Sequence, residues 1–232
     1  MRRIRSLPPP SPTLDAPYPR HVRATDAAVG AGAILDPGVN LWLWRRDLDA
    51  DVVDAAAQAA AHAPHSTRVV TPIDDRHAAI DRMLEAHHTP AGPARTRLAQ
   101  DMASLAFLFA RVSGLARVQV RLDAAVSEAC PLFHVDSVPL RLLCTYVGAG
   151  TEWLADADAD RDELGLQGRS ITRANTAIRG DAHVRRVPSG WVAICKGRRF
   201  GDATAGVVHR SPDPAGVPRL LLVIDQPMEA AA

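Results

Sequence analysis

The 232-residue sequence has few cysteines and almost no surplus of charge of either sign. Its three cysteines, Cys130, Cys144 and Cys195, are widely spaced and include no C-x-x-C pair, which excludes a disulfide framework and a thiolate zinc knuckle. Lysine and arginine number 27 against 26 acidic residues, so the basic surplus typical of nucleic-acid-binding proteins is missing. We therefore expect no nucleic-acid partner.

Long apolar segments are also missing. No stretch approaches the roughly 18 consecutive apolar residues of a membrane-spanning helix, and the basic start MRRIRS is not followed by the apolar segment of a signal peptide. These absences predict a cytoplasmic protein with no membrane partner. Six prolines within residues 1–20 predict a disordered arm, and we expect residues 21–232 to form a single domain.

The first part of this domain, about 40–114, has helical patterns. They predict helices at about 47–63, 74–88 and 94–112. The last is the clearest, since apolar residues recur every three or four positions along one face: Leu98, Met102, Leu105 and Phe109.

From about 115 to 227 the periodicity becomes that of strands. Five short apolar or alternating runs are separated by glycine, proline and aspartate: RVQVRLDA, LRLLCTYV, WVAIC, GVVH and RLLLVID. Helices followed by strands, with no β-α-β alternation, predict an α+β fold in which the helices cover an antiparallel sheet that is closed or sandwiched.

The segment FHVD is the most informative in the chain. In an extended strand, residues two apart point to the same face, so His134 and Asp136 would lie side by side. A third ligand, His209, lies 75 residues later in another strand-like run. Two histidines and one carboxylate are the ligand set of non-haem Fe(II) oxygenases. These three ligands leave three coordination positions of the metal open. Alternatively, His134 and Asp136 form a structural hydrogen-bonded pair, and His209 lies in a loop.

A co-substrate such as 2-oxoglutarate would need a cationic partner for its distal carboxylate. Arg219 follows His209 by ten residues, after the turn-forming SPDPAGVP, and would return to the metal end of the sheet. Arg210 and Arg141 are also near the predicted ligands, so the carboxylate partner could be any of the three. Tyr146, with Thr145 beside it, lies on the strand after FHVD and could hydrogen-bond a bound oxo-acid.

Four blocks, FHVDSVPLRLLCTYVGAGTEW, WVAICKG, GVVHRSP and RLLLVID, resemble the bacterial family labelled domain of unknown function 1826, over about 117–226. That resemblance implies no established activity. Members often lie beside genes for zinc-handling GTPases of the metallochaperone type, which implies a functional link to such a GTPase. The H-x-D, distal histidine and following arginine also resemble the 2-oxoglutarate and Fe(II)-dependent oxygenases, which implies a double-stranded β-helix, a jelly-roll or cupin-like barrel, beneath the helices.

Two functions therefore remain open from the sequence. The first is a dioxygenase that uses Fe(II) and 2-oxoglutarate and acts on an unknown small molecule or protein. The second is a non-catalytic zinc protein of metal homeostasis that binds Zn²⁺ with the same three ligands.

Overall fold

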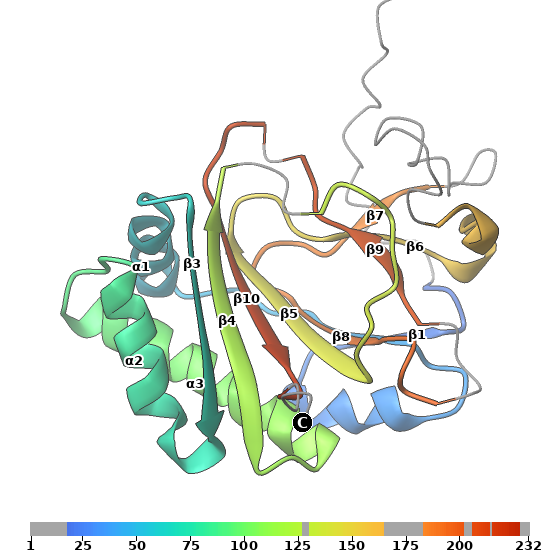
Figure 1. Cartoon of the computed structure of the whole chain (residues 1–232), viewed down its shortest axis with the longest axis horizontal. Helices are drawn as coiled ribbons and strands as arrows, with labels where there is room; N and C mark the ends of the chain where they lie inside the picture. Colours follow the sequence, from blue (N-terminus) through green and yellow to red (C-terminus); the bar gives the residue numbers. More distant parts are fainter. Residues whose placement is uncertain (1–17, 127–129, 165–182, 202–205, 214, 228–232) are drawn as a thin grey trace, which may run out of the picture.

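The computed structural model describes residues 18–126, 130–164, 183–201, 206–213 and 215–227 (Figure 1). The predicted proline-rich arm at 1–20 lies almost entirely outside these residues. Among the described residues, no helix is both long and apolar enough to cross a membrane.

Three α-helices form one layer: α1 (Ala50–Ala60), α2 (Arg76–Ala86) and α3 (Pro93–Ser113). Each predicted helix is confirmed, with ends a few residues different. α3 starts at a proline, whose missing N–H costs nothing in the first turn. It ends at Gly114, which has a φ of 70°, a left-handed conformation that favours glycine.

A seven-stranded sheet has the order β1-β2-β8-β5-β10-β4-β3. Its strands are β1 (Val22–Thr25), β2 (Leu41–Trp44), β3 (His65–Pro72), β4 (Arg117–Ala125), β5 (Leu140–Val147), β8 (Val192–Lys196) and β10 (Arg219–Asp225). Neighbouring strands are antiparallel except β1 and β2, which are parallel. The sheet is therefore mixed, where a purely antiparallel one was expected.

A smaller sheet, with the order β7-β6-β9, lies across the large sheet from the helices (Figure 1). It comprises β6 (Glu152–Leu154), β7 (Arg185–Arg186) and β9 (Val208–Arg210). The described strands form two facing sheets and do not close into a barrel. Short 3-10 helices connect the strands: η1 (Ala28–Leu35), η2 (Ile73–Asp75), η3 (Asp156–Asp158) and η4 (Arg161–Glu163).

Strand β10 separates two hydrophobic cores. Leu220, Leu222 and Ile224 pack toward the helices, whereas Leu221 and Val223 pack toward the small sheet. Because alternate residues share a face, Arg219 and Asp225 lie at the two ends of the row that faces the small sheet. The space between the sheets thus has an apolar middle and a buried charge at each end.

The prediction that residues 40–114 are helical is wrong for two segments, because β2 and β3 both join the large sheet. The sequence LWLW of β2 is apolar at every position, so it has no alternation to mark it as a strand. In β3, a mostly polar sequence pairs with β4 at the sheet edge, where its outer side meets solvent. Neither segment has the period-two pattern that identifies a half-buried strand.

Candidate metal centre

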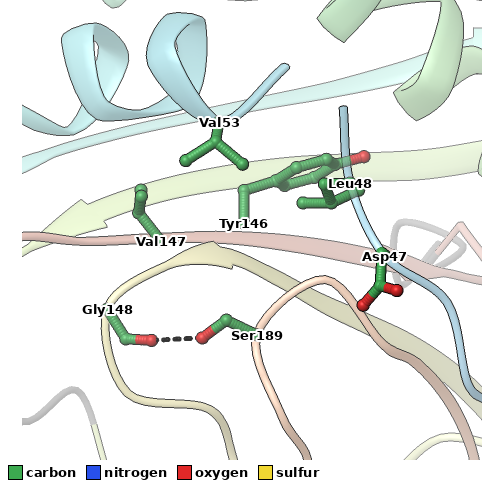
Figure 2. A pocket seen from close by; sticks show the side chains of 7 residues that line it. All are labelled: Asp47, Leu48, Val53, Tyr146, Val147, Gly148 and Ser189. Atoms are coloured by element: carbon green, nitrogen blue, oxygen red, sulfur yellow. Dashed lines mark hydrogen bonds between the residues drawn. The ribbon is translucent and has the colours of Figure 1, made fainter. Parts of the chain in front are cut away.

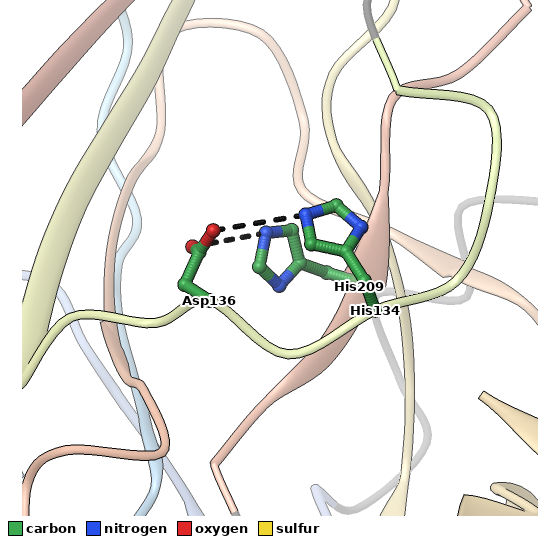
Figure 3. A group of neighbouring side chains, drawn as sticks. All are labelled: His134, Asp136 and His209. Carbon is green, nitrogen blue, oxygen red and sulfur yellow. Dashed lines mark ion pairs between the residues drawn. The ribbon is translucent and has the colours of Figure 1, made fainter. Parts of the chain in front are cut away.

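The two histidines of the predicted ligand set are direct cross-strand neighbours. His134 and His209 form an isolated antiparallel bridge, in which each backbone N–H donates to the other residue's carbonyl at 2.9 Å. Their imidazole centroids are 4.6 Å apart, and Asp136 lies two residues beyond His134. One potential ligand atom from each residue lies within 4.8 Å of the other two (Figure 3). The structure therefore brings all three predicted ligands together.

Backbone carbonyls orient both imidazole rings. The Nδ1 of His134 is 2.8 Å from the Leu132 carbonyl oxygen, and the Nδ1 of His209 is 3.1 Å from that of Val207. Each Nδ1 must carry the proton to donate to a carbonyl, which leaves the Nε2 lone pair free. Both Nε2 atoms face Asp136, at 3.6 Å from His134 and 3.2 Å from His209. Facing lone pairs at such distances need a proton or a metal cation between them.

Asp136 is buried and held in its charged form. Burial alone would raise its pKa, but the neighbouring imidazoles of His134 and His209 and the charge of Arg141 hold that pKa well below its usual range. Its Oδ1 accepts from Arg141 Nη1 at 2.5 Å. Its Oδ2 is buried without a hydrogen-bond partner and is the oxygen nearer His209. A deprotonated carboxylate and two Nε2 lone pairs are a donor set that suits a divalent cation.

A glycine fixes the backbone beside Asp136. A Cβ on Gly197 would lie 2.7 Å from the carbonyl oxygen of Asp136 and 2.1 Å from that of Val138. The next residue, Arg198, donates its backbone N–H to the same Asp136 carbonyl at 2.9 Å. This close approach, possible only without a side chain, holds the loop that presents the carboxylate.

Arg219 is a buried cation that has no acidic partner among the described residues. Its Nη2 donates to the hydroxyls of Thr145 at 3.2 Å and Thr151 at 3.1 Å. Its Nε is buried without a hydrogen-bond partner, and no acidic side chain among the described residues forms an ion pair with it. Burial lowers its pKa to about 10, while the nearby charges of Asp123 and Arg186 act in opposite directions.

Pairing between β6 and β9 relates Arg219 to the histidines. Trp153 lies directly opposite His209, and Thr151 lies two residues before Trp153, a step of about 7 Å along a strand. Residues two apart share a face, so the guanidinium held by Thr151 lies on the same side of the small sheet as His209.

The other two predicted arginines are already paired. Arg210 Nε donates to Glu152 at 2.7 Å and its guanidinium lies over the Phe133 ring at 4.4 Å, while Arg186 takes the second Glu152 oxygen. Arg141 is bound to Asp136 and, through Nε and Nη2, to both oxygens of Asp225 at 2.7 Å. Of the three arginines, Arg219 alone has no carboxylate partner among the described residues.

The structure places Tyr146 on the other face of β5. Its hydroxyl donates to Asp101 of α3 at 2.6 Å. Its ring lines an open pocket of about 340 Å³ beside α1, which Figure 2 shows together with Leu48, Val53 and Ser189. The prediction that Tyr146 meets a co-substrate beside the triad does not fit this placement. Its neighbour Thr145 points to the opposite face of the sheet and contacts Arg219.

Thr151 and Asp225 were not predicted. The only sequence signal for Asp225 was its position, six residues after Arg219 and on the same face of an otherwise apolar strand. Thr151 had no signal, because its role depends on the small sheet folding over the large one.

This arrangement of sheets and helices matches the double-stranded β-helix fold seen in solved dioxygenase structures. The crystal structure of the dioxygenase for auxin oxidation from rice aligns with a TM-score of 0.51 and 15 % identity, over 88 % of this chain and 81 % of that one. The corresponding dioxygenase 1 of Arabidopsis thaliana, solved with 2-oxoglutarate, aligns at 0.50 and 11 % identity, over 91 % and 94 %.

The chain belongs to the family described as protein of unknown function DUF1826, whose model matches residues 26–225. No curated protein matches this sequence.

Proposed function

We propose that this protein is an Fe(II)- and 2-oxoglutarate-dependent dioxygenase. His134, Asp136 and His209 would bind the metal, and Arg219 would bind the distal carboxylate of 2-oxoglutarate. The observation that carries the proposal is the buried Arg219, which has no acidic partner among the described residues and lies on the same side of the small sheet as His209. A structural zinc site would have no use for such a cation.

The energetics of Arg219 favour an anionic ligand. A buried guanidinium without a counter-charge destabilises the folded chain, and few proteins keep one unless it is paired or binds a ligand. The two threonine hydroxyls satisfy one nitrogen but carry no charge. A carboxylate would supply both the missing charge and an acceptor for the free Nε–H.

The site also has the environment that oxidative chemistry requires. When bound, Fe(II) and 2-oxoglutarate would supply activation of O₂ coupled to decarboxylation of the oxo-acid to succinate and CO₂. The chain's own residues hold the donor atoms in place and exclude water. The apolar side chains of Leu143, Trp153 and Val223, all buried between the two sheets, lower the local polarity and thereby strengthen each charged contact.

Succinate formation tests the proposal. Protein purified without metal would be loaded with Fe(II) anaerobically, mixed with 2-oxoglutarate and exposed to air, and succinate would be measured by mass spectrometry. We expect slow formation even without a second substrate, and none in the His209→Ala variant. Tight zinc binding with neither 2-oxoglutarate binding nor succinate would overturn the proposal and support the zinc-protein alternative.

A further inference from the structure

We infer that Arg141 is a positioning residue that restricts Asp136 to binding the metal through Oδ2 alone, and that Asp225 holds Arg141 in place. This inference rests on the metal site of the proposed function and deepens it. It depends on two buried carboxylates, those of Asp136 and Asp225, and on the partly buried guanidinium of Arg141, which binds both of them.

The geometry divides the two oxygens of Asp136. Oδ1 is bound by Arg141 Nη1 at 2.5 Å, whereas Oδ2 has no hydrogen-bond partner and lies 3.2 Å from His209 Nε2. The carboxylate therefore cannot turn to present both oxygens to a metal without losing a short charge-assisted hydrogen bond. Asp136 is 8 % exposed, so water cannot easily replace that bond.

Asp225 fixes the guanidinium from the opposite side. It accepts from Nε and Nη2 at 2.7 Å each, which is the two-pronged arrangement that defines the plane of an arginine most strictly. Asp225 is 5 % exposed and ends β10. Arg219 lies at the other end of β10 and on the same face. This one strand therefore carries the proposed co-substrate anchor, Arg219, and the residue that positions Asp136 through Arg141.

The consequence concerns the number of coordination positions that remain open. Two histidines and one carboxylate oxygen leave three positions on a six-coordinate ion. A co-substrate that binds through two atoms occupies two of them, and O₂ needs the third. If Asp136 bound through both oxygens, only two would remain. Arg141 thus preserves the position that the proposed chemistry needs.

The chain contains a matched control for this pair. Arg46 binds both oxygens of Asp101 at 2.6 and 2.9 Å, and both side chains are largely buried. This second arginine–aspartate pair lies on the helix side of the large sheet, next to Tyr146, and does not contact the triad. Removing it tests the general cost of losing a buried ion pair.

The test uses Co²⁺ as the probe metal, under anaerobic conditions, with the full chain. The double variant Arg141→Gln/Asp225→Asn removes one charge of each sign, so the net charge of the chain stays the same while the restraint on Asp136 is lost. We expect Co²⁺ binding to weaken about 10- to 100-fold, as for other groups that orient metal ligands. We also expect the visible absorption spectrum of bound Co²⁺ to change with the coordination.

Control variants separate the outcomes. Arg46→Gln/Asp101→Asn should bind Co²⁺ within about twofold of the wild type with an unchanged spectrum, even if its melting temperature falls. If the first double variant does not fold, Arg141→Lys decides, because one ammonium cannot bridge both carboxylates and should weaken binding by about tenfold. If the variants at position 141 kept the wild-type Co²⁺ affinity and spectrum, the positioning role of Arg141 would be overturned, but not the metal site. Failure of the wild type to bind Co²⁺ would overturn the metal site itself.

Discussion

Replacing Arg219 with methionine should make the protein more stable and less able to bind its co-substrate. Burial lowers the pKa of Arg219 from 12.5 to about 10, which corresponds to about 3 kcal/mol of destabilisation of the charged form at neutral pH. Methionine fills a similar volume without the charge. The hydroxyls of Thr145 and Thr151 each lose a hydrogen bond worth about 1 kcal/mol. The net gain is about 1 kcal/mol, or roughly 3 °C in melting temperature for a chain of this length.

2-Oxoglutarate, in contrast, should stabilise the wild type and not the Arg219→Met variant. At about 100 times its dissociation constant, a ligand stabilises the wild type by about 2.7 kcal/mol. Truncating one partner of a buried ion pair costs about 3–5 kcal/mol, so Arg219→Met should weaken 2-oxoglutarate binding by a factor of roughly 10² to 10⁴. The melting temperature of the variant should then not respond to concentrations that saturate the wild type.

Differential scanning calorimetry of both proteins, loaded with Co²⁺ and with or without 2-oxoglutarate, measures both effects. Arg46→Met is the control, because Arg46 has a bidentate acidic partner. Its loss leaves Asp101, whose side chain is 21 % exposed, without its cationic partner, although the hydrogen bond from Tyr146 remains. This should lower stability by about 2 kcal/mol. The same substitution should therefore have opposite signs at the two arginines. An Arg219→Met variant that is less stable than the wild type and still stabilised by 2-oxoglutarate would show that Arg219 does not bind the co-substrate.

Two further predictions concern other parts of the chain. Burial, and then the neighbouring His65, lower the pKa of His87 to about 4; an unfolded histidine takes up a proton near 6.5, so stability should fall by about 3 kcal/mol as the pH drops from 6.5 to 4. Denaturant titrations at a series of pH values should show a smaller loss of unfolding free energy in His87→Gln than in the wild type. An equal dependence on pH in both proteins would contradict the lowered pKa of His87. Gly197→Ala should weaken Co²⁺ binding at least fivefold, because its Cβ meets the Asp136 carbonyl. Gly32→Ala, with open space around it, should bind as the wild type does; equal binding by both variants would argue against the role of Gly197.

The triad could be predicted because strand geometry makes its spacing meaningful. His134 and Asp136 are two residues apart, and His209 lies in a strand-like run, so a pairing of the two segments was enough to bring the three side chains together. That pairing connects positions 75 residues apart, and sequence pattern alone does not determine which strands become neighbours. The ligand set was therefore predictable as a hypothesis, but its cross-strand geometry was not.

The error at Tyr146 has a similar physical origin. Thr145 and Tyr146 are adjacent on β5, so one must face each side of the sheet, and both sides are buried. A strand buried on both faces gives no polar and apolar alternation to show which side holds the site. The choice among Arg141, Arg210 and Arg219 was open for another reason, because only the folded chain shows which arginines already have carboxylate partners.

Metal-dependent binding of 2-oxoglutarate is the decisive test of the proposed function. Isothermal titration calorimetry of 2-oxoglutarate into anaerobic, Fe(II)-loaded protein should give one equivalent bound, with no binding to the metal-free protein or to the Asp136→Ala variant. A fully loaded metal site that binds no 2-oxoglutarate would contradict the proposed function.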